Sequence, residues 1–384
     1  MEKKRLGDIC EIVTGATPKT NIKEFWDGDI NWITPAELTE DTYIINESLR
    51  KITTEGVEKT GLKSFPKGTV ILSSRAPIGK VAIAGCEMYC NQGFKNLVCS
   101  KQINNRFLYW YLKGHKEYLN SLGRGATFKE ISKAIVENIE ICLPTLEKQE
   151  KYADILEQCN GIIQIKKGQL RKLDTLVKSR FAEMFGDPIR NPKGWKVVTI
   201  GDIVTEVRYG TSKPAVEGGK YPYLRMNNLT ADGHLDLNDL KYIDISDDEV
   251  EKCVVRKGDV LFNRTNSIDL VGKTAVFDLP DDMVIAGYII RVRLNEKILP
   301  EVLSQYMNLE ALKDILRSMA KGAVNQANIN AQELQSIRIY VPDIELQKQF
   351  VEMKDQVDKS KSKIQKSLEE TQLLFDSLMQ KYFG

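Results

Sequence analysis

Apolar and polar positions follow the same order twice along the chain. Alternating apolar segments such as TVILSS (69–74) and DVLFN (259–263) lie next to Lys-Gly and Gly-Lys pairs, a pattern typical of strands joined by tight turns. Helical spacing follows in FLYWYLKGHKEYLNSL (107–122) and in PEVLSQYMNLEALKDILRSM (300–319), and a short apolar segment then ends at a proline. We therefore expect two mixed α/β domains, each with a β-rich beginning.

The order is shared because the sequence itself is repeated. LGDICEIVTG returns as IGDIVTEVRYG, so that Gly7 corresponds to Gly201. RGATF then corresponds to KGAVN, IEICLPTLEKQ to IRIYVPDIELQ, and MFG to YFG, in the same order along both halves. Ordered matches of this kind indicate a duplicated unit, and each half should have the same fold.

A proline-free stretch of about 40 residues follows Pro144 and Pro342, and each stretch ends at Phe-Gly. Apolar residues recur in both with heptad spacing, which predicts long helices of roughly 60 Å. One alternative is that each helix buries its apolar face against its own domain alone. Each helix is too long to be covered by one domain, so we expect the two long helices to pair with each other. If a pseudo-twofold axis relates the repeats, the helices must run antiparallel as a coiled coil. The predicted seam consists of Ile155, Ile162, Leu173, Leu176, Phe350, Val357, Ile364 and Leu378.

Composition excludes several classes of function. The 384 residues carry a net charge of +2, which is weakly basic for a nucleic-acid-binding protein, although clustered cations can still form a footprint. Seven scattered cysteines without a CxxC pair do not indicate a disulfide framework, and two histidines are too few for a His-rich metal site. No signal-peptide pattern and no run of about 18 apolar residues is present, so we expect a cytoplasmic protein.

Catalytic motifs are also missing from the sequence. There is no Walker A loop, no GxGxxG after a strand, no GxSxG, no HExxH and no Asn/Asp-Pro-Pro-aromatic signature of an adenine methyltransferase. We therefore expect no catalytic residue, no bound metal and no cofactor in this chain.

Several segments resemble the specificity subunits of type I restriction-modification systems. FGDPIRNPKGW (185–195) is similar to the junction at which the first long helix passes to the second target-recognition domain of that family. The repeated helix entries at 139–149 and 337–347 resemble the same family, as do LGDICEIVTGATP, NWITPAEL, SSRAPIG and CNQGFKNL. Together these segments cover nearly the whole chain.

The resemblance implies a non-catalytic subunit that reads a bipartite, asymmetric DNA sequence, one half with each domain. It implies two modification subunits as partners, which carry the S-adenosylmethionine-dependent methyltransferase, and restriction subunits, which use ATP and Mg²⁺. The expected order is a first recognition domain at 1–144, a helix at 145–186, a second recognition domain at 187–342 and a second helix at 343–384. The helices would set the gap between the two half-sites.

Candidate DNA contacts lie in loops that combine glycine with basic and amide side chains. Lysine and arginine suit phosphates, while arginine can read guanine and asparagine or glutamine can read adenine. A neighbouring glycine lets the backbone approach a phosphate closely. Ordinary solvated turns are the alternative, and Arg75 and Arg264 could instead anchor their domains through ion pairs. The candidates in the first half are Thr17, Lys19, Arg75, Lys80, Gln92, Lys95, Arg124 and Lys129. Those in the second half are Arg208, Tyr209, Thr211, Ser212, Lys213, Arg225, Asn227, Asn228, Arg264, Asn266, Lys321, Asn325 and Gln326.

Two other functions are compatible with parts of the sequence. A coiled-coil adaptor could recruit proteins through the long helices without binding DNA. A nuclease could use Pro342, Asp343, Glu352 and Lys354 as a loose PD…ExK motif, in which the carboxylates hold Mg²⁺. That chemistry requires Glu352 and Lys354 on a strand beside the aspartate, whereas the pattern places them in a helix.

Overall fold

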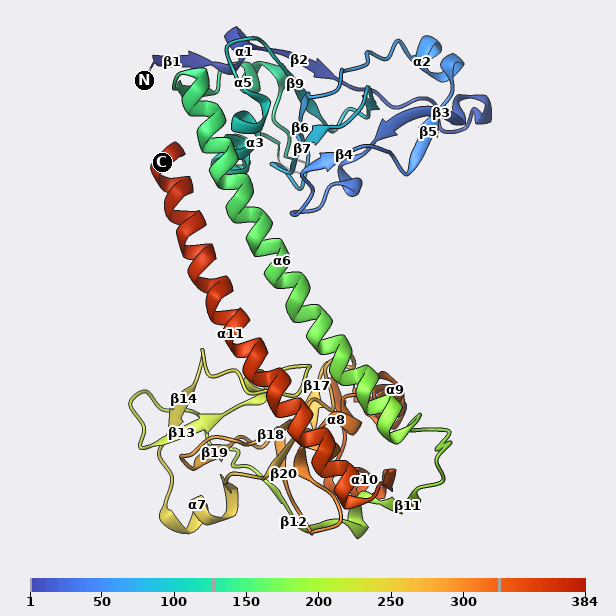
Figure 1. Cartoon of the computed structure of the whole chain (residues 1–384), viewed down its shortest axis with the longest axis vertical. Helices are drawn as coiled ribbons and strands as arrows, with labels where there is room; N and C mark the ends of the chain where they lie inside the picture. Colours follow the sequence, from blue (N-terminus) through green and yellow to red (C-terminus); the bar gives the residue numbers. More distant parts are fainter. Residues whose placement is uncertain (1, 126–128, 324–325) are drawn as a thin grey trace. The chain divides into compact units, whose positions relative to one another are not determined.

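The computed structural model describes residues 2–125, 129–323 and 326–384, and for residues 321–323 and 326 it describes the backbone only. The chain forms two compact units (Figure 1). The first unit consists of residues 1–167 and 366–384, and the second consists of residues 168–365. Each unit therefore contains one α/β domain and a segment of both long helices.

The domain of the first unit contains a five-stranded sheet in the order β2-β9-β6-β7-β4, a three-stranded sheet in the order β5-β3-β8, and the pair β1-β10. Its strands are β1 (Glu2–Arg5), β2 (Cys10–Thr14), β3 (Trp26–Ile33), β4 (Ile44–Ile45), β5 (Arg50–Ile52), β6 (Val70–Leu72), β7 (Val81–Ala84), β8 (Tyr89–Cys90), β9 (Lys95–Cys99) and β10 (Glu140–Leu143). Its helices are α1 (Leu6–Ile9), η1 (Lys23–Phe25), η2 (Pro35–Glu37), α2 (Thr54–Thr60), α3 (Asn105–Gly114), α4 (Lys116–Ser121) and α5 (Lys133–Glu137).

The domain of the second unit contains the sheets β12-β20-β16-β18, β14-β13-β19-β15 and β17-β22-β21, and the pair β11-β23. Its strands are β11 (Lys196–Thr199), β12 (Val204–Tyr209), β13 (Tyr221–Leu224), β14 (Lys241–Ile243), β15 (Val254–Val255), β16 (Val260–Asn263), β17 (Thr265–Asn266), β18 (Thr274–Val276), β19 (Met283–Ile285), β20 (Ile289–Leu294), β21 (Lys321–Ala323), β22 (Gln326–Asn328) and β23 (Arg338–Val341). Its helices are η3 (Ile200–Asp202), η4 (Met226–Asn228), α7 (Asp247–Cys253), α8 (Pro300–Met307), α9 (Glu310–Met319) and α10 (Ala331–Ser336).

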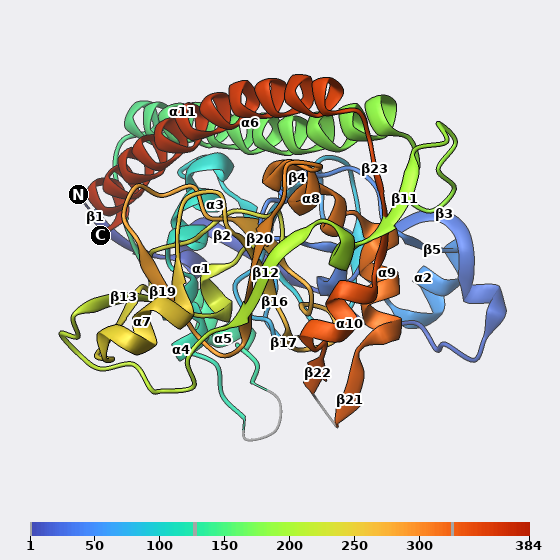
Figure 2. The ribbon, with the colours of Figure 1, turned by 90° about the horizontal axis from the view of Figure 1, so that it is seen from below.

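The sequence repeat reappears as a repeat of strand pairing. The first strand of each domain pairs antiparallel with the strand that leads into a long helix. Strand β1 pairs with β10. Strand β11 pairs with β23 (Figure 2). A short parallel pair also recurs, because β3 lies beside β8 in one domain and β13 beside β19 in the other. The two domains therefore share one fold.

The long helices are α6 (Leu146–Phe185) and α11 (Ile344–Phe383), of 40 residues each. In the first unit the rings of Tyr152 and Tyr382 stack with centroids 3.9 Å apart. In the second unit, Phe181 meets Phe350 with centroids 5.3 Å apart. Because later residues of α6 meet earlier residues of α11, the two helices run antiparallel (Figure 1). The prediction of two mixed α/β domains and a pair of long antiparallel helices is confirmed.

Each helical segment also packs on the domain of its own unit. Phe375 and Phe383 of α11 lie against Trp110 and Phe107 of α3, with ring centroids 5.6 and 5.2 Å apart. In the second unit, Phe181 belongs to one apolar cluster with the core of the domain. Burying a large apolar side chain contributes roughly 1.5 to 3 kcal/mol, so these contacts hold helices and domain together as one unit.

The seam expected on α6 is wrong by one position at two residues. Ile162 and Leu176 are 44% and 43% exposed, whereas the adjacent Ile163 and Val177 are 3% and 7% exposed. The reason is that α6 packs against both α11 and a domain, so its buried face is displaced from the heptad stripe expected for a single partner helix. The other predicted seam residues are buried or partly buried: Ile155, Leu173, Phe350, Val357, Ile364 and Leu378.

Candidate nucleic-acid interface

Several loops of the second domain meet at one pocket of about 540 Å³. The parallel strands β13 and β19 end side by side, which brings residues 225–227 next to residues 286–288. Strands β12 and β16 both run antiparallel to β20, so the residues that follow them lie beside the start of β20. Of the predicted DNA contacts, the strand arrangement brings together Thr211, Ser212, Lys213, Arg225, Asn227 and Arg264.

Arg264 is fixed in the pocket by its backbone and by an aromatic ring. Its N–H donates to the Tyr288 carbonyl at 3.0 Å, and its carbonyl accepts the Ile329 N–H at 2.9 Å. The guanidinium carbon lies 4.9 Å from the centroid of the Tyr209 ring. Nε is buried and has no hydrogen-bond partner among the described residues. The sequence left open an ion pair that would anchor Arg264 to its domain. Among the described residues Arg264 has no such carboxylate partner.

Arg225 also lines this pocket. Its Nη2 donates to a carboxylate oxygen of Asp239 at 2.6 Å and to the Asp239 carbonyl at 3.0 Å, while Nε is buried without a described partner. The buried Asn228 accepts the Arg225 backbone N–H at 2.8 Å and donates to the Asp236 carbonyl. Asn228 therefore holds the loop in place through its hydrogen bonds. The DNA contact of Arg225 stays a prediction.

Lys213 stands at the exposed edge of the pocket and pairs with Glu249. Hydrogen bonds from Lys213 and from the Thr211 hydroxyl lower the pKa of the Glu249 carboxyl. The pocket thus combines an exposed lysine, which is paired with Glu249, and two arginines whose Nε groups have no described partner.

The equivalent loops of the first domain have different chemistry. Thr17 donates a hydrogen bond to the amide oxygen of Gln92, which joins two of the loops directly. Lys80 donates to the carbonyls of Pro35 and Leu38, and Lys273 does the same to Met226 and Leu229 in the second domain. Because the same contact recurs in both domains, it gives Lys80 a structural role, and its contact with DNA stays a prediction.

Glu130 holds two of the predicted cations of the first domain. It pairs with Arg75 at 2.9 Å and with the buried Lys95 at 3.1 Å. Burial alone would raise the pKa of Glu130, but hydrogen bonds from Lys95 and Arg75 outweigh it and lower that pKa. The ion pair considered for Arg75 is thus present, although the Arg75 side chain is 44% exposed rather than buried.

The remaining candidates are spread over several places, with Tyr209 beside Arg264 at the pocket. Arg208 pairs with Glu206 at 3.0 Å, the Tyr209 hydroxyl accepts the Ala331 N–H, and the Asn266 amide donates to Asn263. Asn325 lies outside the described residues, and only the backbone of Lys321 and Gln326 is described. The basic candidates that are exposed and have no described ion pair are Lys19, Arg124 and Lys129.

Sequence reasoning missed the loop formed by Ala286, Gly287 and Tyr288, which lines the same pocket. The signal was present, because this loop occupies the place of Asn91, Gln92 and Gly93 before a matching strand. Gly210 carried a second signal: a Cβ there would lie 2.1 Å from the Ile285 carbonyl oxygen, and one on Gly15 would lie 1.9 Å from that of Cys90. Only glycine allows this approach of two loops.

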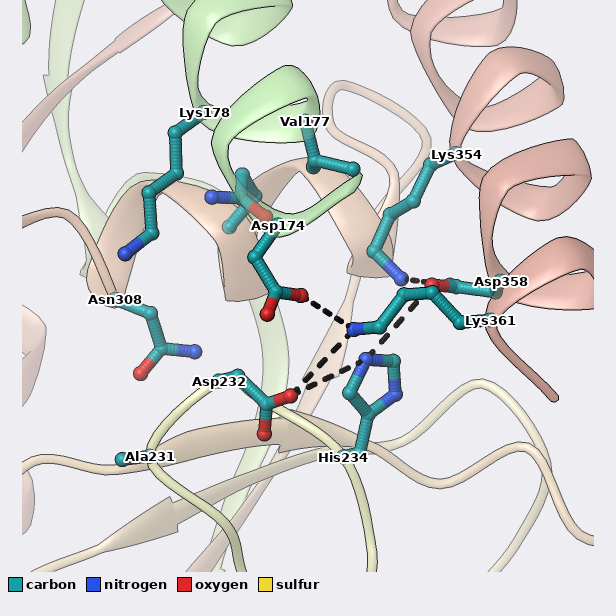
Figure 3. Close-up of a pocket in the computed structure, with 11 residues that line it drawn as sticks. Asp174, Val177, Lys178, Ala231, Asp232, His234, Asn308, Lys354, Asp358 and Lys361 are labelled. Carbon is teal, nitrogen blue, oxygen red and sulfur yellow. Dashed lines mark hydrogen bonds and ion pairs between the residues drawn. The ribbon is translucent and has the colours of Figure 1, made fainter. Parts of the chain in front are cut away.

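A second pocket of the same unit has a volume of about 200 Å³ and is lined by charged side chains that pair with one another (Figure 3). Lys361 of α11 lies 2.7 Å from Asp174 of α6 and 3.6 Å from Asp232, which stands in the loop after η4. His234 lies 3.9 Å from Asp232 and 3.8 Å from Asp358. Burial would lower the pKa of Lys361, but Asp174 and the other carboxylates raise it. This cluster fastens the loop to the helices, and none of the described acidic, histidine or cysteine groups is arranged to hold a metal ion.

The nuclease alternative lacks its geometry. Glu352 and Lys354 both lie within α11 and not on a strand beside Asp343, and Lys354 pairs with Asp358. No described helix is long and apolar enough to cross a membrane.

Comparison with known proteins gives one consistent family. Residues 1–175 and 192–371 match the type I restriction modification DNA specificity domain. The type I restriction enzyme MjaIX specificity subunit of Methanocaldococcus jannaschii is 38% identical over 248 residues, which are 59% of this chain and 57% of that protein. The EcoKI specificity subunit of Escherichia coli is 24% identical over 352 residues, 85% of this chain and 76% of that protein.

Solved structures agree in fold. The S subunit of a type I restriction-modification system from M. genitalium has a TM-score of 0.63 at 14% identity and covers 100% of this chain and 96% of its own. A chain from a structural study of complex assembly and conformational transition in the type I system has a TM-score of 0.58 at 19% identity, with coverage of 100% and 97%. The chain belongs to the family of type I restriction-modification DNA specificity domains.

Proposed function

We propose that this chain is the DNA sequence-specificity subunit of a type I restriction-modification complex and that each unit reads one half of a bipartite, asymmetric target. The observation that carries the proposal is that loops with arginine, lysine and asparagine side chains meet at one pocket of the second domain, with equivalent loops in the first. Arginine, asparagine and glutamine at such loops suit the edges of base pairs in the major groove. The unequal residues of the two domains account for an asymmetric target.

The partners proposed for the chain are two modification subunits and the restriction subunits. Two units of one fold offer two similar surfaces, which suits two copies of one partner. The methyltransferase cofactor S-adenosylmethionine, ATP and Mg²⁺ would be bound by those partners, and the complex would act in the cytoplasm.

The test is methylome sequencing of cells that express the chain with its cognate modification subunits. A split, asymmetric motif with methylated adenines, lost when this chain is deleted, is the expected result. The control is a strain that retains the modification subunits alone. If the complex assembles and no such motif appears, the proposal fails.

The coiled-coil adaptor is separated from this function by the salt dependence of duplex binding. Neutralising several phosphates makes affinity fall steeply with ionic strength, since counterions are released. Binding of a duplex that carries the motif should therefore weaken strongly between 50 and 200 mM salt. An assembled complex with no duplex affinity at low salt would favour the adaptor.

A further inference from the structure

We infer that Arg264 reads a guanine in the half-site of the second unit and that the first domain has no such reader at the equivalent position. This inference rests on the proposed function and adds the chemistry of one base contact to it.

The equivalent position is defined by backbone hydrogen bonds and not by sequence likeness. The Ser74 N–H donates to the Gly93 carbonyl at 2.8 Å, and the Ser74 carbonyl accepts from Ile131 at 2.9 Å. Arg264 makes the same two bonds with Tyr288 and Ile329. Ser74 and Arg264 therefore occupy the same place in the shared fold. The first domain has a small neutral residue there, and the second has a guanidinium.

Among the described residues the Arg264 guanidinium has no carboxylate partner, and it contacts the Tyr209 ring and the Gly287 carbonyl. Three other arginines of this domain pair with carboxylates: Arg225 with Asp239, Arg291 with Glu206 and Arg293 with Asp259. No carboxylate of the described residues lies within 4.0 Å of Arg264, and among these residues its side chain donates one hydrogen bond, from Nη1 to the Gly287 carbonyl at 3.5 Å. A partly buried cation without a counter-charge costs free energy. That cost is relieved when an external acceptor enters the pocket.

The pocket favours a base edge over a phosphate. The Tyr209 ring lies 4.9 Å from the guanidinium carbon and limits the rotation of its plane. A planar fork held in this way matches the O6 and N7 acceptors of guanine, which lie side by side at one base edge. Phosphates are commonly met by exposed lysines and backbone N–H groups, and Lys213 at the edge of this pocket is the group of that kind.

The experiment compares the methylated motif of the complete complex for the wild type, R264A and R264K. We expect R264A to relax a single guanine position, in one half-site only, and to weaken binding of the wild-type site roughly 5- to 150-fold. R264K should relax the same position, since an ammonium lacks the two-pronged edge. The matched control is R256A, which removes an arginine of the same domain that pairs with Glu251 and Asp282; it should leave the motif unchanged.

A modified base tests the contact directly. Replacing that guanine by 7-deazaguanine removes the N7 acceptor and should weaken wild-type binding but not R264A binding. If R264A lowers methylation equally at all sites without changing the motif, or if R264K keeps full guanine preference, Arg264 does not read guanine. These outcomes leave the proposed function intact, because that function fails only if the wild-type complex has no motif.

Discussion

Two buried glutamines show what single residues contribute to both halves of this protein. Gln149 accepts the Asn104 N–H at 2.8 Å and donates to the Pro144 carbonyl at 2.9 Å. Gln347 accepts the Leu299 N–H at 2.8 Å and donates to the Pro342 carbonyl at 2.8 Å. Each amide thus joins the start of a long helix to the helical part of its domain. The repeat marked these glutamines as equivalent, but Asn104 and Leu299 lie 45 and 48 positions away and could not be predicted as their partners.

Lys313 gives a pH-dependent prediction at the same scale. Its ammonium is buried, donates to the Gly272 carbonyl at 2.6 Å, and has its pKa lowered to about 8, chiefly by burial. An unfolded lysine titrates near 10.4, so between these values the unfolded chain binds more protons at this site and stability rises with pH. From pH 7.5 to 9.5 the wild type should gain roughly 2 kcal/mol in free energy of unfolding relative to K313M. Urea unfolding at both pH values measures this.

The control for that measurement is K252M, at an exposed lysine of the same unit. The difference between wild type and K252M should be the same at both pH values. Parallel pH curves for the wild type and K313M would show that Lys313 titrates as an ordinary lysine.

The candidate site could be predicted only in part, for a physical reason visible at Lys80 and Arg264. Lys80 lies directly before β7 and Arg264 directly after β16, and in sequence both look like DNA contacts. The fold gives Lys80 two backbone carbonyls from a loop about 40 residues away, whereas Arg264 receives no carboxylate among the described residues. Long-range strand pairing decides which basic side chain receives a hydrogen-bond or ion-pair partner within the domain. The residue type alone does not reveal this pairing.

At the scale of elements, the existence and ends of the long helices were predictable and their buried face was not. The proline-free stretches and the closing Phe-Gly placed both helices within a residue or so of Leu146–Phe185 and Ile344–Phe383. The buried face of α6 differed because a heptad count assumes one partner helix, while Val177 and Phe181 pack on α11 and on the domain together.

This difference predicts a contrast between two substitutions in α6. Phe181 is fully buried against Phe185, Phe350 and Tyr306, so F181A should lower the free energy of unfolding of the second unit by about 3 to 5 kcal/mol. L176A, at a residue that the heptad count placed in the seam, should cost under about 1 kcal/mol because Leu176 is 43% exposed. Chemical unfolding of the two variants makes the comparison. Equal losses of unfolding free energy in F181A and L176A would show that Leu176 is part of the buried seam after all.

At the scale of the whole molecule, the shared fold was predictable because strand pairing repeats wherever the sequence repeats. The composition of the compact units was not, since each takes in residues from both copies of the long helix. Contacts such as Tyr152 with Tyr382 join residues that are 230 positions apart, counted as 382 − 152. No local pattern encodes such a pairing.

Each helix passes from one unit to the other, at Lys167–Gly168 in α6 and at Gln365–Lys366 in α11. Seven helical residues inserted at both points would add about 10.5 Å of helix and keep the antiparallel partners matched. We expect the gap between the methylated half-sites to lengthen by roughly three base pairs, at 3.4 Å each, while both half-site sequences stay the same. Methylome sequencing reads both properties.

The control insertion is the same seven residues placed at Lys193, in the loop between α6 and β11 and outside both helices. It should leave the gap unchanged. A change of half-site sequence with an unchanged gap would show that the helices do not set the spacing.

The edge-to-face contact of Phe375 with Trp110 has a consequence for how the protein is made. The ribosome synthesises 265 residues, counted as 375 − 110, between these two rings. At about 5 to 20 residues per second, the aromatic surface of α3 stays uncovered for roughly 10 to 50 s after it emerges. During this interval the aromatic surface of α3 is accessible to chaperones and to other nascent chains. Translation that stops before residue 366 would release a first domain whose core is never closed.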